Sequence, residues 1–210
     1  MVNETWLTSK QSYILENTQY SMIRKDDPTD KPARGVAIVF KRGIQVDTNI
    51  LPLHLQFPNI TILKILLKQA GKHLFLMSFY CPPKNEAKTL CHLGLILEYL
   101  SNKYQKWNLV AYSDVNIDLR PHQIPKKSAI ATVFFSPFSL FNHFLFKILS
   151  NIKSKYGLEP VVPKGKDYTR EGLDFLKAKS FLDFFFVKLD QVKGEKNPSI
   201  VYFLFLNFNI

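Results

Sequence analysis

The chain has 210 residues, of which 46% are hydrophobic; this is ample for one packed domain and argues against an intrinsically disordered chain. Lys and Arg number 28 against 17 acidic residues, and the formal net charge of +11 favours an anionic partner, with nucleic acid before an acidic membrane surface. A basic protein without a polyanionic partner is the alternative. Cys81 and Cys91 are the only cysteines, and their spacing excludes a zinc site and a disulfide framework.

The first half of the chain contains short apolar runs that end at turn residues. "GVAIVF" at 35–40, followed by "KRG", predicts a strand and a turn. "ITILKILL" at 60–67 and "HLFLMSFY" at 73–80 flank "KQAGK", which predicts a hairpin with Gly71 in its loop. "CPPKNEA" then breaks the sheet, because proline cannot donate a ladder hydrogen bond.

A helix and a strand follow in the middle of the chain. The apolar residues of 87–104 recur at helical spacing, which predicts one buried face. That face carries Leu90, Leu93, Ile96, Leu97 and Leu100. "NLVAY" at 108–112 predicts the next strand, and a polar loop is expected at 116–128.

The Phe-rich segment 130–149 is about as long as a bilayer-spanning helix. Its polar and helix-breaking residues make it a poor span, so a buried helix, or a loop and a helix, is expected there. These residues are Pro137, Asn142, His143 and Lys147. The helix should end near "SKYGLEPVV", and two further strands are expected at 180–189 and 199–208.

Strands that pair in hairpins but are interrupted by helices predict a mixed sheet covered by helices, in an α/β or α+β fold. Near-continuous apolar strands such as "GVAIVF" indicate burial on both faces, as in stacked layers. The N-terminal "MVNETWLTSK" is not a signal peptide. A nuclear or cytoplasmic protein that is not secreted and has no membrane partner is therefore expected.

Polar residues collect at the predicted strand ends, where sites in layered α/β folds usually form. Cleavage of a phosphodiester needs a divalent cation, a base that aligns water, and donors that hold the phosphate. Carboxylates, an amide and a phenol supply most of these groups. The candidates are Glu4, Tyr80, Asp114, Asn116, Thr169, Arg170 and Asp183.

Each candidate also has a structural interpretation. Asp114 and Asn116 are favoured turn residues that bond to their own backbone, and Tyr80 before Cys-Pro-Pro suits a rim aromatic. Asp183 lies among Phe and Leu, where an unpaired charge is costly, so it needs a partner or a metal. Asp174 in "REGLDFL" competes with Asp183 for the same role.

A family resemblance connects these residues. "ETWL" at 4–7, the block at 20–44 that contains "RKDDPTDKPARGVAI", and "SFYCPP" at 78–83 occur in a characteristic order. "YSDVNIDL" at 112–119, "DYTREG" at 167–172 and "SFLDFFFV" at 180–187 complete that order. Together they resemble the endonuclease domain of non-LTR retrotransposons, of the LINE and jockey-like elements. That domain belongs to the exonuclease–endonuclease–phosphatase superfamily.

The resemblance implies a four-layer α/β sandwich, in which two facing mixed sheets are covered by helices, over residues 1–190. Residues 191–210 would form a divergent C-terminal tail, expected to be a strand. Glu4 would bind Mg²⁺ or Mn²⁺, and Tyr80 would lie at the phosphate. Asp114 would align or deprotonate water, and Asn116 would hold a phosphate oxygen. Asp183 would support the catalytic His, and Thr169 and Arg170 would contact the DNA.

The sequence departs from the family pattern at both ends. The family strand with a catalytic Asn precedes the "ETWL" glutamate, whereas this sequence begins three residues before Glu4, which indicates truncation. The family Ser-Asp-His motif is also missing after "LDFFFVKL". Because loss of one preorganised group commonly lowers a rate by ~100- to 1000-fold, an impaired enzyme is expected.

Four functions compete at this point. The first is a Mg-dependent endonuclease that nicks DNA to prime reverse transcription by a linked reverse transcriptase. The second is a catalytically dead relic that binds nucleic acid through its basic surface. A phosphatase of the same superfamily is disfavoured by the "RGVAI" and "TR…LD" blocks, and a small membrane protein rests only on 130–149.

Overall fold

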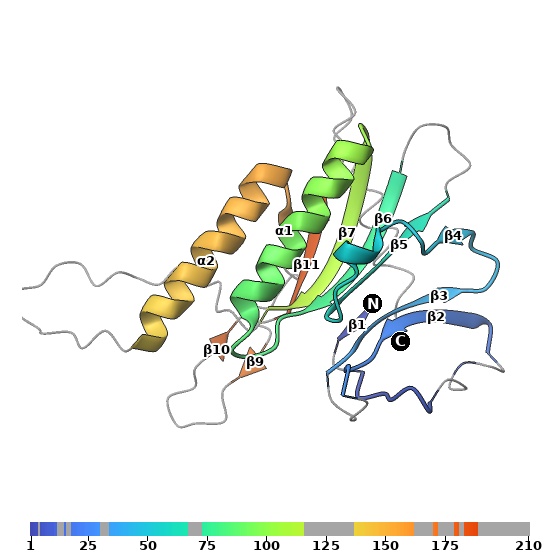
Figure 1. Ribbon diagram of the computed structural model, residues 1–210, viewed down its shortest axis with the longest axis horizontal. Helices are drawn as coiled ribbons and strands as arrows, with labels where there is room; N and C mark the ends of the chain where they lie inside the picture. The colour runs from blue at the N-terminus through green and yellow to red at the C-terminus, as the bar shows by residue number, and fades with distance from the viewer. Residues whose placement is uncertain are drawn as a thin grey trace, which may run out of the picture.

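Figure 1 shows the protein as a computed structural model. The residues that it describes are 1–3, 5–11, 15, 18–29, 34–66, 73–115, 137–161, 170–171, 179–180 and 183–188. Predicted features that lie outside them include the loop with Gly71, the polar loop at 116–128 and the strand at 199–208, within the predicted tail.

The larger sheet has six strands in the order β4-β5-β6-β7-β11-β8. They are β4 (Val46–Asp47), β5 (Ile60–Ile65), β6 (His73–Tyr80), β7 (Trp107–Asp114), β11 (Asp183–Lys188) and β8 (Glu159–Val161). Only β6 and β7 are parallel, and α1 (Glu86–Lys103) connects them; all other pairs are antiparallel. The sheet is therefore mixed, as predicted.

A smaller antiparallel sheet has the order β1-β3-β2, with β1 (Val2–Asn3), β3 (Val36–Lys41) and β2 (Tyr20–Lys25). A two-stranded ribbon pairs β9 (Arg170–Glu171) with β10 (Lys179–Ser180). A short 3-10 helix, η2 (Leu53–Leu55), precedes β5. The sequence patterns did not predict β2, because its apolar residues are few and two basic residues end it.

Helices cover one face of the larger sheet (Figure 1). The predicted apolar face of α1 is fully buried there, and Leu145 and Leu149 of α2 (Pro137–Tyr156) join the same core. Sheet residues at alternate positions, including Phe75, Met77 and Leu109, pack beneath the helices. The helix predicted to end near "SKYGLEPVV" is confirmed as α2.

The smaller sheet packs against the opposite face of the larger one, with β3 over β5 and β6. Val36 and Ile38 of β3 are fully buried, as is Leu63 of β5. Helices, larger sheet and smaller sheet thus form three successive layers in the part of the chain that the structure describes. The predicted fold class, a sandwich of two facing sheets with a helical cover, is confirmed, and three of its four predicted layers lie among the described residues.

The Phe-rich segment corresponds in its described part to α2. Among the described residues, no helix is both long and apolar enough to cross a membrane. Pro137 is the first residue of α2, where a proline is tolerated because the N–H it lacks would have no helical partner.

Candidate active site

Three predicted site residues lie in one row across the larger sheet. Tyr80 ends β6, Asp114 ends β7, and Asp183 begins β11. The backbone of Tyr80 pairs with that of Asp114, and the backbone of Asp114 pairs with that of Asp183. Three residues far apart in the sequence are thus brought to one edge, the lower end of the sheet in Figure 1.

The strand that leads into Glu4 reaches this row from the smaller sheet. The Ser78 hydroxyl lies 3.0 Å from the Val2 carbonyl oxygen and 2.7 Å from Asn3 Oδ1. Ser78 and Tyr80 are two residues apart in β6, so their side chains leave the same face. Glu4 itself lies outside the described residues, but its neighbour Asn3 is fixed beside the strand that carries Tyr80.

Buried polar atoms without hydrogen-bond partners flank the position of Glu4. Within the described part of the chain, Asn3 Nδ2 and Thr5 Oγ1 are both buried and unpartnered. Such groups are costly unless a ligand, an ion or water completes them. They mark this end of β1 as a place that suits a polar ligand.

The row is electronegative. Burial raises the pKa of the Cys81 thiol well above its ordinary value, and the charges of Asp114 and Glu86 raise that pKa further. The Cys81 N–H donates to the Asp114 carbonyl oxygen at 2.9 Å, which fixes the end of β7 against the start of the Pro-Pro turn. The thiol therefore stays protonated near neutral pH and is not a nucleophile.

Glu86 is an acidic residue that the sequence interpretation overlooked. It is 7% exposed in the first turn of α1, and its Oε2 has no hydrogen-bond partner among the described residues. The positive end of the helix dipole stabilises a carboxylate at that position. A signal was present in the sequence, because an acid follows Pro-Pro-Lys-Asn directly before a helical apolar pattern.

Two carboxylates, those of Asp114 and Glu86, thus lie close enough to Cys81 to raise its pKa. No cluster of three or more acids, His or Cys is found in the described ranges. Any fuller ligand set would need residues outside them, such as Glu4.

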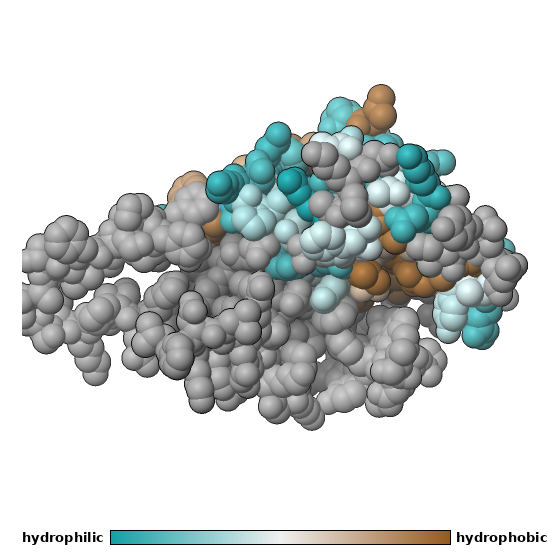
Figure 2. Space-filling model, turned by 90° about the horizontal axis from the view of Figure 1, so that it is seen from below, coloured by the Kyte–Doolittle hydropathy of each residue, from teal (hydrophilic) through white to brown (hydrophobic). Residues whose placement is uncertain are grey.

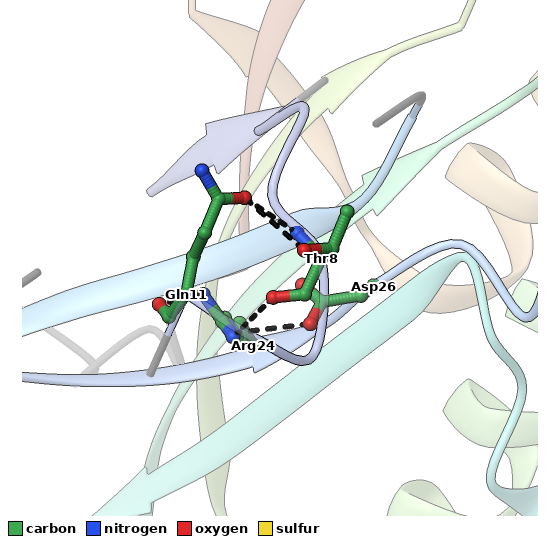
Figure 3. A network of polar contacts seen from close by, with 4 residues as sticks. All are labelled: Thr8, Gln11, Arg24 and Asp26. Atoms are coloured by element: carbon green, nitrogen blue, oxygen red, sulfur yellow. Dashed lines mark hydrogen bonds and ion pairs between the residues drawn. The ribbon is translucent and has the colours of Figure 1, made fainter. Parts of the chain in front are cut away.

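A polar network holds the segment that follows Glu4 (Figure 3). Arg24 of β2 donates from Nη1 to the Gln11 carbonyl oxygen at 2.8 Å and from Nη2 to the Thr8 carbonyl oxygen at 2.9 Å. Asp26 orients the guanidinium, with Oδ2 3.2 Å from Arg24 Nε. Arg24 and Asp26, from the block at 20–44, therefore hold residues 8–11 against the smaller sheet.

The other predicted site residues are less completely placed. Asn116 and Thr169, and the competing Asp174, lie outside the described residues. The backbone of Arg170 is paired in the β9–β10 ribbon, which lies below the start of α1 in Figure 1.

Figure 2 views the molecule from below, and the described part of that face is hydrophilic around a limited hydrophobic strip.

Solved structures with the same fold include an endonuclease domain and a second catalytic domain. The endonuclease domain of TRAS1, a telomere-specific non-LTR retrotransposon, matches with a TM-score of 0.53 and 16% identity, over 80% of this chain and 66% of that one. The human Nocturnin catalytic domain gives 0.52 and 10%, over 88% and 66%. D. rerio TDP2, complexed with a single strand DNA product, gives 0.50 and 11%, over 90% and 70%.

These matches show that the chain shares the fold of these structures, which is the fold that the sequence resemblance implied. The chain spans 66% of the first two structures, somewhat less than two thirds of their length. No protein-family model and no curated protein matches the sequence.

Proposed function

We propose that the chain is a retroelement-type endonuclease domain that cleaves DNA phosphodiesters with Mg²⁺ or Mn²⁺. The observation that carries the proposal is the paired row of Tyr80, Asp114 and Asp183, which β1 approaches through Ser78. The TRAS1 endonuclease domain is one structure of the same fold with that activity. In an intact element, the nick would prime synthesis by a linked reverse transcriptase.

In this proposal, Asp114, the last residue of β7, aligns the attacking water and accepts its proton. Tyr80, at the end of the neighbouring strand, donates a hydrogen bond from its phenolic hydroxyl to the phosphate. Asn116 would hold a phosphate oxygen, and Thr169 and Arg170 would contact DNA beside it. Asp183, whose backbone pairs with that of Asp114, would support the active-site network.

A bound divalent cation would supply charge neutralisation for the phosphate. Glu4 would hold it, with Asp114 and Glu86 adding negative potential. Asn3 and Thr5, with their buried unpartnered atoms, would hold Glu4 or an ordered water from either side.

The second candidate is a nucleic-acid-binding protein without cleavage activity. The observation that favours it is the net charge of +11. Binding of this kind should weaken steeply with salt and be indifferent to sequence.

Nicking of supercoiled plasmid DNA in Mg²⁺ distinguishes the two candidates. The endonuclease should convert plasmid to the nicked form, and Asp114→Asn should lower the rate by ~100- to 1000-fold. Asp47→Asn is the matched control, because Asp47 pairs with Lys64 at the opposite end of the sheet and should leave the rate unchanged. A native protein that binds DNA but nicks no faster than Asp114→Asn would overturn the endonuclease in favour of the second candidate.

A further inference from the structure

Trp6 is a large aromatic side chain held in the open. It is 58% exposed, although tryptophan is usually well buried in a folded core. Its φ is 54°, in the left-handed region that bulky residues rarely adopt. Backbone strain of this kind persists only where the surrounding structure imposes it, and it is frequent at functional sites.

Arg34, two residues before β3, is hydrogen-bonded to the Trp6 backbone. The Trp6 N–H donates to the Arg34 carbonyl oxygen at 3.1 Å, and Arg34 also has a positive φ, 59°. Arg34 Nε lies 3.4 Å from Oδ2 of Asp27, whose side chain is only 4% exposed, while 51% of the Arg34 side chain is exposed. An aromatic ring and a cation are thus presented from two adjacent, hydrogen-bonded segments.

The segment of Trp6 is connected to the candidate active site through β1. Trp6 follows β1, whose Asn3 contacts Ser78 two residues before Tyr80 in β6. A further exposed cation, Lys84, follows the Tyr80 strand end in the sequence and also has a positive φ, 72°. The exposed ring and the Arg34 cation therefore belong to segments that the chain and its hydrogen bonds connect to the strand that carries Tyr80.

We propose that Trp6 and Arg34 form a nucleic-acid contact, in which Trp6 stacks on an unpaired base and Arg34 pairs with an adjacent phosphate. This inference rests on the proposed function in its choice of nucleic acid as the ligand. Stacking on an aromatic side chain is indifferent to base identity and depends on an exposed, fixed ring. An adjacent guanidinium supplies the charge that a phosphate requires.

The chain itself provides a fluorescence reporter. It contains two tryptophans, and the other one, Trp107, is 2% exposed in the helix-covered core. Titration with a thymidine oligonucleotide in EDTA, which prevents cleavage, should quench only the Trp6 emission. An abasic sugar–phosphate oligomer of the same length should bind more weakly and should not quench, because it has no base to stack.

Labelled oligomers measure the affinity directly. Trp6→Leu should bind the thymidine oligomer about 5- to 150-fold more weakly than the native chain, to the level of the abasic oligomer. Trp6→Phe retains a ring and should stay near native affinity. Arg34→Gln should weaken binding of both oligomers alike, because a phosphate contact needs no base.

Leu53→Ser is the matched control, because Leu53 is an even more exposed apolar residue, at 83%, in the short helix before β5. It should bind both oligomers as the native chain does. The buried Trp107 emission and a thermal unfolding curve show whether each variant is folded. Trp6→Phe keeps the comparison valid even if Trp6→Leu is unstable.

The inference is overturned if native protein fails to prefer the thymidine oligomer over the abasic one, or if Trp6→Leu binds as tightly as Trp6→Phe. Failure to bind either oligomer overturns it as well. These binding measurements need no cleavage, so their outcome is independent of the nicking assay. If the native protein nicks DNA and Trp6→Leu binds the oligomers with native affinity, only the Trp6 inference is overturned. Base-dependent binding without nicking removes the endonuclease and retains the contact.

Discussion

At the scale of single residues, Gly35 is the position where a side chain is excluded most clearly. Its φ is +85°, and a Cβ built there would collide with Thr5 Oγ1. Gly35 also accepts the Thr5 N–H through its carbonyl oxygen, at 3.4 Å. The close approach of residue 5 to β3 therefore depends on glycine, and with it the position of the segment that carries Glu4.

Gly35→Ala should lower the free energy of unfolding by about 1–3 kcal/mol, because it adds the left-handed penalty and the collision with Thr5. Gly94→Ala is the matched control: no atom lies within 4 Å of a Cβ there, and the residue is inside α1. That variant should gain about 0.5–1 kcal/mol. Urea unfolding of both variants measures the difference, and equal stabilities would contradict the close approach of Thr5.

The buried Cys81 thiol should make stability fall at alkaline pH. The pKa of the thiol is higher in the folded chain than in the unfolded chain, where it is near 9.0. Its contribution to the free energy of unfolding is therefore complete below pH 9.0 and is lost as the pH rises above that value. Between pH 8 and 10 the loss should be roughly 1–1.5 kcal/mol. Only the unfolded chain releases the proton in that range.

Urea unfolding at the two pH values checks this expectation. Cys81→Ala should flatten the decline relative to the native chain, since it removes the thiol itself. Cys91→Ala, which removes an exposed thiol instead, is the control and should keep the native slope. An identical slope in Cys81→Ala and the native chain would show that other groups cause the decline.

Sequence patterns identified individual polar positions better than their surroundings. Tyr80 and Asp114 could be selected because each closes an apolar run, and the backbone pairing brings them together. Glu86 carries a signal for a helix start but none for a site, and Asn3 carries none, because an amide near a terminus is ordinary in sequence. Their significance comes from burial without a partner, which only the folded chain reveals.

At the scale of elements, β2 stabilises the smaller sheet through Arg24 rather than through apolar packing. The Arg24 side chain is 14% exposed and contacts two carbonyl oxygens of the segment 8–11 together with Asp26. A planar guanidinium suits this arrangement, because its donors diverge in a fixed fork. The strand thereby holds a segment with no regular structure of its own.

Arg24→Leu should therefore lower the free energy of unfolding by about 2–4 kcal/mol, since it removes charged hydrogen bonds and leaves Asp26 without its ion pair. Arg42→Leu is a close control: Arg42 also contacts two carbonyl oxygens, those of Tyr20 and Leu15, but in an exposed setting. It should cost about 1 kcal/mol or less. Thermal unfolding compares them, and similar losses would mean that Arg24 is no more than a surface contact.

Elements with one strong period were predictable, and short ones were not. The spacing of Leu90, Leu93 and Leu97 determined α1 because a helix repeats every 3.6 residues, and all three are buried. β1 and β9 have two residues each, and β8 has three, too few for any period to emerge. Such short strands form because the backbone of a neighbouring strand provides hydrogen-bonding partners for them.

At the scale of the whole molecule, composition and element order predicted layers, but not which strands are neighbours. Alternating strands and helices indicated a covered mixed sheet. The insertion of β11 between β7 and β8 is determined by long-range pairing, which no local pattern encodes. The same limit applies to the site, because the row exists only once that order is established.

The position of β11 has a consequence for the order of assembly. Tyr80 and Asp114 are joined through a compact strand–helix–strand unit, whereas Asp183 pairs with Asp114 from roughly 70 residues further along. Loop closure of that length is entropically costly and tends to come late in folding. In the proposed endonuclease, the row of Tyr80, Asp114 and Asp183 would then be completed last, after the core has become compact. A newly synthesised chain would pass through a stage that is folded in its centre but still lacks the third residue of that row.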